Sequence, residues 1–235
     1  MNIIEKKQDS VSFTAEISEP LANSIRRYVN QIPVLAVDEV EISKNDSPLY
    51  DETISHRLGL IPLNPGKAEA KKLPSIRLSV SNEGMVYSKD IRGVDIVHGE
   101  MPITFLNKGQ ELDLKATTKL GRGEEHSKFS PGFVFYRNVM EISADKSLAE
   151  EIRGLCRENE AKEKADGIVV IDNLKKSVAD ICQGVAKRHG KKIEITPKEE
   201  LVVTVESFGQ LKPEEILKSS IRELKKDLNE VSKKV

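Results

Sequence analysis

The chain has 235 residues, a formal net charge of −1 and a charged-residue content of 32%. This length is enough for one large domain or two smaller ones, and the near-neutral balance excludes a chain that is basic throughout, as many nucleic-acid-binding proteins are. Two cysteines are too few for a disulfide framework or a four-cysteine metal site, and they suit a reducing compartment. The sequence has neither an apolar signal core nor a run of ~18 apolar residues, so we expect a soluble cytoplasmic protein that makes no membrane contact.

The first quarter of the chain predicts two strands and two helices in alternation. Apolar residues at every second position predict a strand over residues 11–17, and a second strand is predicted over 37–42. Between them, residues 21–31 place their apolar side chains on one helical face, and Pro33 ends that helix. Residues 51–58 predict a short helix with acidic residues in its first turn, where the helix dipole favours them.

The middle of the chain predicts a mostly antiparallel β region. Short apolar segments are separated by turn sequences that contain glycine. The strands are expected over residues 76–80, 94–97, 103–105, 112–118 and 133–140.

The composition changes near Ala144, and residues 144–197 predict a small α/β insert. The pattern indicates a charged helix over 147–165, a strand over 168–171, a helix over 173–188 and a strand over 193–195. Cys156 and Cys182 stand beside apolar helix positions. We expect them to pack against each other rather than to bind metal, because the sequence has no Cys-x-x-Cys pair.

After a further predicted strand over 201–206, the last helix, opened by Pro213, carries the clearest physical signal. Its apolar residues follow a spacing of four, three, four and three, namely Leu217, Ile221, Leu224, Leu228 and Val231. We call these five residues the apolar seam. So narrow a seam is typical of a helix that packs against one partner helix. The helix at 21–31 explains part of the seam equally well, but it is shorter, so the remainder predicts a second polypeptide and an obligate dimer or heterodimer.

Three polar groups could carry chemistry, and each has a structural alternative. Arg26 and Arg27 could bind an acidic surface or a phosphate, or form a solvated helix face. His56 beside Arg57 could act as a base, but no nucleophile lies nearby in the sequence. The loop at 121–126 contains Gly-Arg-Gly without the Lys-Ser or Lys-Thr of a phosphate-binding loop, so a turn between strands explains it better.

Two other functions stay open at this point. The basic cluster at 187–192 allows a free-standing nucleic-acid-binding protein, although it lacks interleaved aromatic residues. A small hydrolase that uses His56 or His126 is the other alternative. Because no catalytic motif is present and the four histidines are scattered, we expect no catalytic residue, no metal and no independent active site.

Four blocks resemble the RNA polymerase alpha-like family, which comprises bacterial alpha, its archaeal D-type counterparts and the eukaryotic third-largest subunits. The blocks span residues 21–42, 51–63, 120–128 and 205–217, in the family's order and over nearly the whole chain. The last three resemble the archaeal and eukaryotic branch. The resemblance implies an α+β fold in three parts. A discontinuous dimerisation domain (1–44 and 198–235) has a sheet and two long helices, a mostly antiparallel β insertion domain covers 45–143, and a small ferredoxin-like α/β insert covers 144–197.

The resemblance also implies a non-catalytic assembly subunit of DNA-dependent RNA polymerase, a nucleotidyltransferase whose active site lies in other subunits. The implied partners are subunit L in a heterodimer, the second-largest subunit on which the pair docks to nucleate assembly, and the small subunits N and P. DNA is reached only through the holoenzyme. The implied partner-binding residues are the apolar seam and the matching motif positions: Arg26, Arg27, His56, Arg57, Arg122, His126, Leu217, Ile221, Leu224, Leu228 and Val231.

The insert departs from the family pattern. Many archaeal relatives hold an iron–sulfur cluster there with clustered cysteines, and some eukaryotic relatives bind zinc. This sequence retains only Cys156 and Cys182. We therefore expect no cofactor, and we expect apolar helix faces to hold the insert together.

Overall fold

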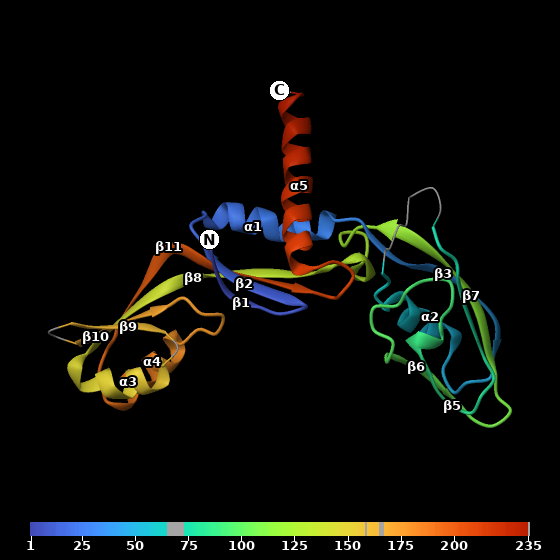
Figure 1. Ribbon diagram of the computed structural model, residues 1–235, viewed down its shortest axis with the longest axis horizontal. Helices are drawn as coiled ribbons and strands as arrows, with labels where there is room; N and C mark the ends of the chain where they lie inside the picture. Colours follow the sequence, from blue (N-terminus) through green and yellow to red (C-terminus); the bar gives the residue numbers. More distant parts are fainter. Residues whose placement is uncertain (65–72, 158, 165–166, 235) are drawn as a thin grey trace. The chain divides into compact units, whose positions relative to one another are not determined.

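The computed structural model describes residues 1–64, 73–157, 159–164 and 167–234 (Figure 1). The chain forms two compact units, one made of residues 1–26 and 134–206 and the other of residues 27–133 and 207–235. The described residues form a mixed α+β protein whose strands pair mostly antiparallel, as the sequence predicts.

The first unit is built on one six-stranded sheet. Its strand order is β1 (Asn2–Lys6), β2 (Ser10–Ala15), β11 (Glu194–Ser207), β8 (Gly132–Asp145), β10 (Gly167–Asp172) and β9 (Glu160–Lys164). An N-terminal strand and a late strand of the chain are neighbours in this sheet, because β2 pairs antiparallel with β11 and Phe13 stands opposite Val203. The predicted strands at 193–195 and 201–206 are parts of the single strand β11. The strand β1 was not predicted from the polar N-terminal sequence.

Two helices pack on the part of the sheet formed by β8 and β10. They are α3 (Ala149–Leu155), preceded by the 3-10 turn η4 (Lys146–Leu148), and α4 (Ala179–Arg188). Ile142 and Ile168 from the strands share a buried cluster with Ile152 from α3 and Val185 from α4. This cluster confirms that apolar helix faces contribute to the core of the insert.

Both insert helices are shorter than predicted. The helix predicted over 147–165 ends at Leu155, and β9 then pairs with β10, so that Ala161 stands opposite Val170. Residues 158 and 165–166 lie outside the described residues. A longer helix would have had almost no apolar side chain to bury after Leu155, which explains the change to a strand. The second helix begins at Ala179 rather than at residue 173.

The second unit is centred on a three-stranded sheet and a hairpin. The sheet has the order β3 (Val34–Asn45), β7 (Leu112–Gly121) and β4 (Ile76–Val80), and the hairpin pairs β5 (Gly84–Tyr87) with β6 (Pro102–Leu106). The 3-10 turns η2 (Ser88–Asp90) and η3 (Ser127–Phe129) lie in the connections. The strand predicted over 94–97 is wrong, because this segment makes only the isolated bridge between Ile96 and Leu63. The strand β5 was not predicted.

The helix α2 (Asp51–Gly59) completes the core of the second unit. Its Ile54 and Leu58 are fully buried and join the cluster that contains Leu78 and Leu114 from the sheet. The predicted helix at 51–58 is therefore confirmed, and its buried face fixes the side of α2 that carries the polar residues.

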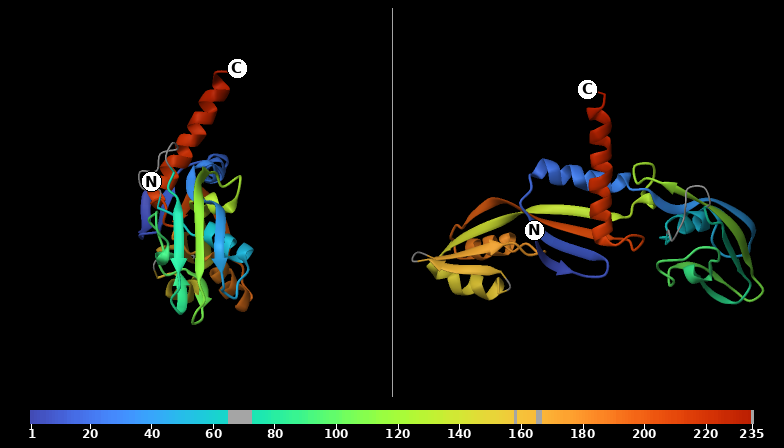
Figure 2. Two further views of the ribbon diagram at one scale, coloured as in Figure 1. Left: turned by 90° about the vertical axis from the view of Figure 1, so that its right-hand side faces the viewer. Right: turned by 45° about the horizontal axis from the view of Figure 1, so that its top comes forward.

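Two further helices carry most of the residues with a predicted role. The helix predicted over 21–31 is α1 (Glu19–Tyr28), followed by the 3-10 turn η1 (Val29–Gln31), and it ends before Pro33. The last helix is α5 (Pro213–Ser232), which Figure 2 shows as one unbroken helix. Among the described residues, no helix combines the length and the apolar composition needed to cross a membrane.

Candidate functional site

The helix α5 presents two different faces. Pro213, Ile216 and Ser220 are buried in the second unit. The apolar seam lies beside this buried stripe, rotated by roughly 70° around the helix at 3.6 residues per turn. Leu217, Ile221 and Leu224 are half-buried, whereas Leu228 and Val231 are each 59% exposed. The chain therefore covers one stripe of α5 and leaves the distal half of the seam open.

The turn η1 and the end of α1 hold α5 in place. The segment η1 contacts α5, and the Tyr28 hydroxyl donates a hydrogen bond of 3.0 Å to the Asp227 carboxylate. This hydrogen bond raises the pKa of Tyr28, because the phenol donates a proton that the phenolate does not have. The contact confirms the expectation that the first helical segment meets part of the last helix.

The two arginines of α1 differ in their surroundings. The Arg26 guanidinium donates two hydrogen bonds, of 2.8 and 3.2 Å, to the Asn23 side chain one turn earlier. Arg27 is exposed, and within the described part of the chain it makes no hydrogen bond or ion pair. Arg27 is thus the member of the pair whose guanidinium fork stays available to a carboxylate or phosphate.

The Gly-Arg-Gly loop packs against η1. Arg122 Nη1 donates to Gln31 Oε1 at 3.3 Å, and Gln31 Nε2 donates to Glu124 Oε2 at 2.6 Å. Gly123 lies so close to Asn30 that an added Cβ would stand 2.6 Å from the Asn30 Oδ1. The loop is therefore fixed on the turn that follows Arg27, and Arg27 and Arg122 belong to one end of the second unit.

The two histidines of the predicted site lie on different elements of the second unit. His126 Nδ1 accepts a hydrogen bond of 3.1 Å from the Lys128 backbone N–H, which orients the loop. His56 is exposed on α2. Its neighbour Arg57 donates a hydrogen bond of 2.9 Å from Nη1 to the Ile103 carbonyl, which ties α2 to β6. Among the described residues, no hydrogen bond or ion pair joins α2 to the Gly-Arg-Gly loop.

Sequence reasoning missed the polar residues that position these arginines. Gln31 and Glu124 hold the loop, and Lys128 forms an ion pair of 3.6 Å with Asp38 on β3. Gln31, Asp38 and Glu124 all lie inside the blocks that carry the resemblance, so their position in those blocks was the available signal.

The basic cluster of the insert is largely paired with acidic residues of the same unit. The Glu151 carboxylate on α3 accepts from Arg188 at 3.1 Å and from His189 at 2.8 Å. Lys191 lies 3.2 Å from the Asp145 carboxylate. These pairs leave Lys187 and Lys192 as the cations of the cluster that are exposed and have no ion pair within the described residues.

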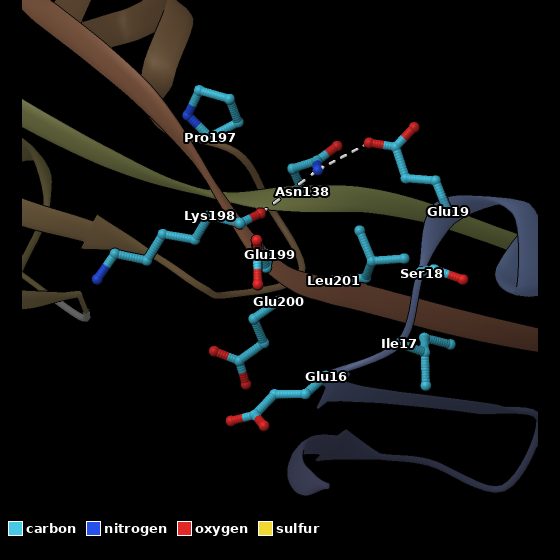
Figure 3. Close-up of a pocket in the computed structure, with 10 residues that line it drawn as sticks. All are labelled: Glu16, Ile17, Ser18, Glu19, Asn138, Pro197, Lys198, Glu199, Glu200 and Leu201. Carbon is cyan, nitrogen blue, oxygen red and sulfur yellow. Dashed lines mark hydrogen bonds between the residues drawn. The ribbon is translucent and has the colours of Figure 1, made fainter.

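A hollow of about 1040 Å³ lies on the first unit beside β11 (Figure 3). Asn138 donates to the Glu19 carboxylate at 2.9 Å across it. Four of the ten lining residues are acidic, most are exposed, and none was predicted as a site: Glu16, Ile17, Ser18, Glu19, Asn138, Pro197, Lys198, Glu199, Glu200 and Leu201. Among the described residues, no group of three or more His, Cys, Asp or Glu is arranged to hold a metal ion.

The two cysteines meet in the core of the insert, as predicted. Both are free thiols, and their sulfurs lie 3.6 Å apart. Burial raises the pKa of both thiols, that of Cys182 to about 12. A thiol in this state is a packing group rather than a nucleophile at neutral pH.

The chain is similar to known proteins over nearly its whole length. Residues 40–132 match the RNA polymerase Rpb3/RpoA insert domain. DNA-directed RNA polymerase subunit Rpo3 of Thermococcus kodakarensis is 36% identical, over 98% of this chain and 97% of that protein. The corresponding subunit of Pyrococcus furiosus is 35% identical, over 94% and 91%, and that of Archaeoglobus fulgidus is 29% identical, over 99% and 96%. The chain therefore belongs to the Rpo3 family of DNA-directed RNA polymerase subunits.

Proposed function

We propose that this chain is a non-catalytic assembly subunit of a DNA-directed RNA polymerase. It forms a heterodimer with a smaller alpha-like subunit, subunit L. The pair docks on the second-largest subunit and nucleates assembly, with the small subunits N and P nearby. DNA is reached only through the assembled enzyme, which works in the cytoplasm, and the insert needs no metal cluster.

The open half of the apolar seam carries this proposal. Leu228 and Val231 are each 59% exposed at the end of a 20-residue helix whose neighbouring stripe already packs on its own chain. Two apolar side chains one turn apart on an otherwise charged helix gain from burial against a partner helix, about 1.5–3 kcal/mol for each that becomes fully covered. The pairing of β2 with β11 supports a dimerisation domain made from both ends of the chain.

Arg27 and the Gly-Arg-Gly loop support the docking role. Arg27 has no partner within the described chain, and Arg122 is held on the next turn by Gln31. A fixed loop beside an unengaged guanidinium is suited to a carboxylate-bearing surface on a large partner. Of the family's motif residues, we assign Arg27 and Arg122 as the principal docking contacts, with Arg26, His56, Arg57 and His126 around them.

The test is co-expression with an L-type subunit, followed by sizing of the purified complex. We expect a one-to-one heterodimer with the unaltered chain. Leu228→Asp should weaken it by roughly 10- to 100-fold, because the change places a charge in the apolar interface. Asn229→Asp is the matched control, since it adds the same charge at the next residue, on another face of α5, and should leave the heterodimer intact. A well-folded monomer that does not bind subunit L contradicts the proposal. An equal loss of the heterodimer with both variants contradicts it as well.

A further inference from the structure

The only two cysteines of the sequence touch each other in the core of the insert. Cys156 caps the C-terminal end of α3, and Cys182 lies in the first two turns of α4. Their side chains are 2% and 0% exposed, and their sulfurs are 3.6 Å apart with no bond between them. The neighbours in the cluster are apolar, among them Ile152, Ile168 and Val185. Two thiols in contact are placed to be joined to each other once an oxidant has reacted with one of them.

We propose that Cys156 and Cys182 form a modification site, in which a two-electron oxidation joins them in an intrachain disulfide that ties α3 to α4. The oxidant is a small disulfide such as oxidised glutathione. One cysteine thiolate attacks the oxidant and releases one glutathione thiolate. The second cysteine sulfur attacks the protein sulfur of that mixed disulfide and releases the other. The two protons of the cysteines end on the two glutathione thiols, so atoms and electrons balance.

The geometry favours this pairing. A disulfide has a sulfur–sulfur distance of ~2.05 Å, so the two sulfurs need to approach by about 1.5 Å from their separation of 3.6 Å. The ends of the two helices are already fixed together at the surface, because Glu151 on α3 holds Arg188 and His189 at the end of α4. The bond therefore requires side-chain rotation and a small shift of α3 rather than a new packing of the insert.

Burial sets the rate of this reaction. At pH 7, a thiol with a pKa of about 12 is ionised to a fraction on the order of 10⁻⁵, and a buried sulfur cannot meet an external oxidant. The first step therefore occurs in molecules in which α3 or α4 has opened transiently. The disulfide therefore forms slowly and persists, unlike the disulfide of a fast redox sensor. Once formed, the bond is protected from reductants by the same burial.

The experiment uses the purified full chain. It is incubated with oxidised glutathione at a temperature a few degrees below its Tm, the remaining thiols are alkylated, and trypsin is added without a reductant. We expect one cross-linked product, with residues 154–157 joined to residues 177–187 and a mass about 2 Da below the sum of the two reduced peptides. A reductant should separate it. The oxidised chain should melt several degrees higher than the reduced chain, because the bond restricts the unfolded ensemble.

The variants Cys156→Ala and Cys182→Ala are the controls, since each retains one thiol that cannot cross-link within the chain. Neither should gain thermal stability on oxidation. Three results would overturn the proposal: thiols that both remain alkylatable, oxidation that yields only glutathione adducts or cross-linked dimers, and a disulfide that forms only after complete unfolding in urea. Neither cysteine lies on α5 or on the Gly-Arg-Gly loop, so this outcome is independent of the proposed polymerase role.

Discussion

The insert around α3 and α4 and the distal half of α5 are both rich in charge, but they are stabilised in opposite ways. In the insert, the apolar side chains are enclosed in one cluster, and the surface charges are matched within the unit, as in the Glu151 pairs with Arg188 and His189. In α5, the charged residues surround apolar side chains that the chain leaves exposed, Leu228 and Val231. The difference separates a part that encloses its apolar side chains from a part that leaves two of them exposed.

The largest expected effect is a loss of stability in the first unit when a buried carboxylate of the insert is removed. Asp172 is fully buried and accepts hydrogen bonds from Arg137 at 2.9 Å, from the Ser177 hydroxyl at 2.7 Å and from the Val178 N–H at 3.1 Å. Asp172→Ala leaves Arg137 without its charge partner and the turn before α4 without its acceptor. The free energy of unfolding of the first unit should fall by about 3 kcal/mol.

Urea denaturation monitored by hydrogen exchange in α4 measures this loss. The control is Asp180→Ala, which removes an exposed carboxylate from the first turn of α4 and should cost no more than about 1 kcal/mol. Similar losses in the two variants would mean that the buried network contributes little. Heterodimer formation through α5 should survive both changes.

The second effect compares the half-buried and the exposed residues of the apolar seam on α5. We expect Leu224→Asp, Leu228→Asp and Val231→Asp each to weaken the pair with an L-type subunit by roughly 10- to 100-fold, about 1.4–2.8 kcal/mol. Only Leu224→Asp should also lower the Tm of the isolated chain, because Leu224 is half-buried whereas the other two are 59% exposed. Calorimetric titration and thermal melts of the same samples separate the two effects. A drop in Tm for all three would mean that the chain itself covers the whole seam.

The sequence predicted the position of the seam but not which stripe of α5 faces the chain's own core. The buried stripe contains Pro213, Ile216 and Ser220, and only one of these is a large apolar residue. Hydropathy therefore could not reveal it. The packing is set instead by η1 and by the hydrogen bond from Tyr28 to Asp227, which are long-range contacts.

The errors in the insert have a similar cause. Residues after Leu155 are charged and have good helix propensity, so the local pattern extended α3 too far. In the structure, residues after Leu155 instead form β9, which pairs with the buried strand β10. The helix α4 starts late because the Asp172 carboxylate holds the turn before it, and a sequence pattern does not show which carboxylate is buried. The bounds of β4 and the start of α5, which depend on local turns and on proline, were predicted correctly.

A smaller effect is expected for Arg27, which we propose contacts the second-largest subunit. Arg27→Glu should weaken binding of the heterodimer to the second-largest subunit by about 10-fold, roughly 1.4 kcal/mol, because an exposed guanidinium that makes no ion pair with the described residues becomes a repelling carboxylate. Arg26→Glu is the matched control. Arg26 already binds Asn23 within its own helix, so its reversal should have the smaller effect. Pull-down of the large subunit with each heterodimer measures the ratio, and equal losses would show that Arg27 has no special role.

The smallest effect tests whether the paired charges of the insert conceal a nucleic-acid site. Glu151→Gln releases Arg188 and His189, and, because the pairs are on the surface, it should cost less than about 1 kcal/mol of stability. If the basic cluster bound DNA, this change would raise the affinity of the isolated chain, and Lys187→Glu would lower it, with a steep dependence on salt. We expect no measurable DNA binding by either variant or by the unaltered chain in fluorescence anisotropy at physiological salt. Tight binding that grows with Glu151→Gln would instead favour a free-standing nucleic-acid-binding protein.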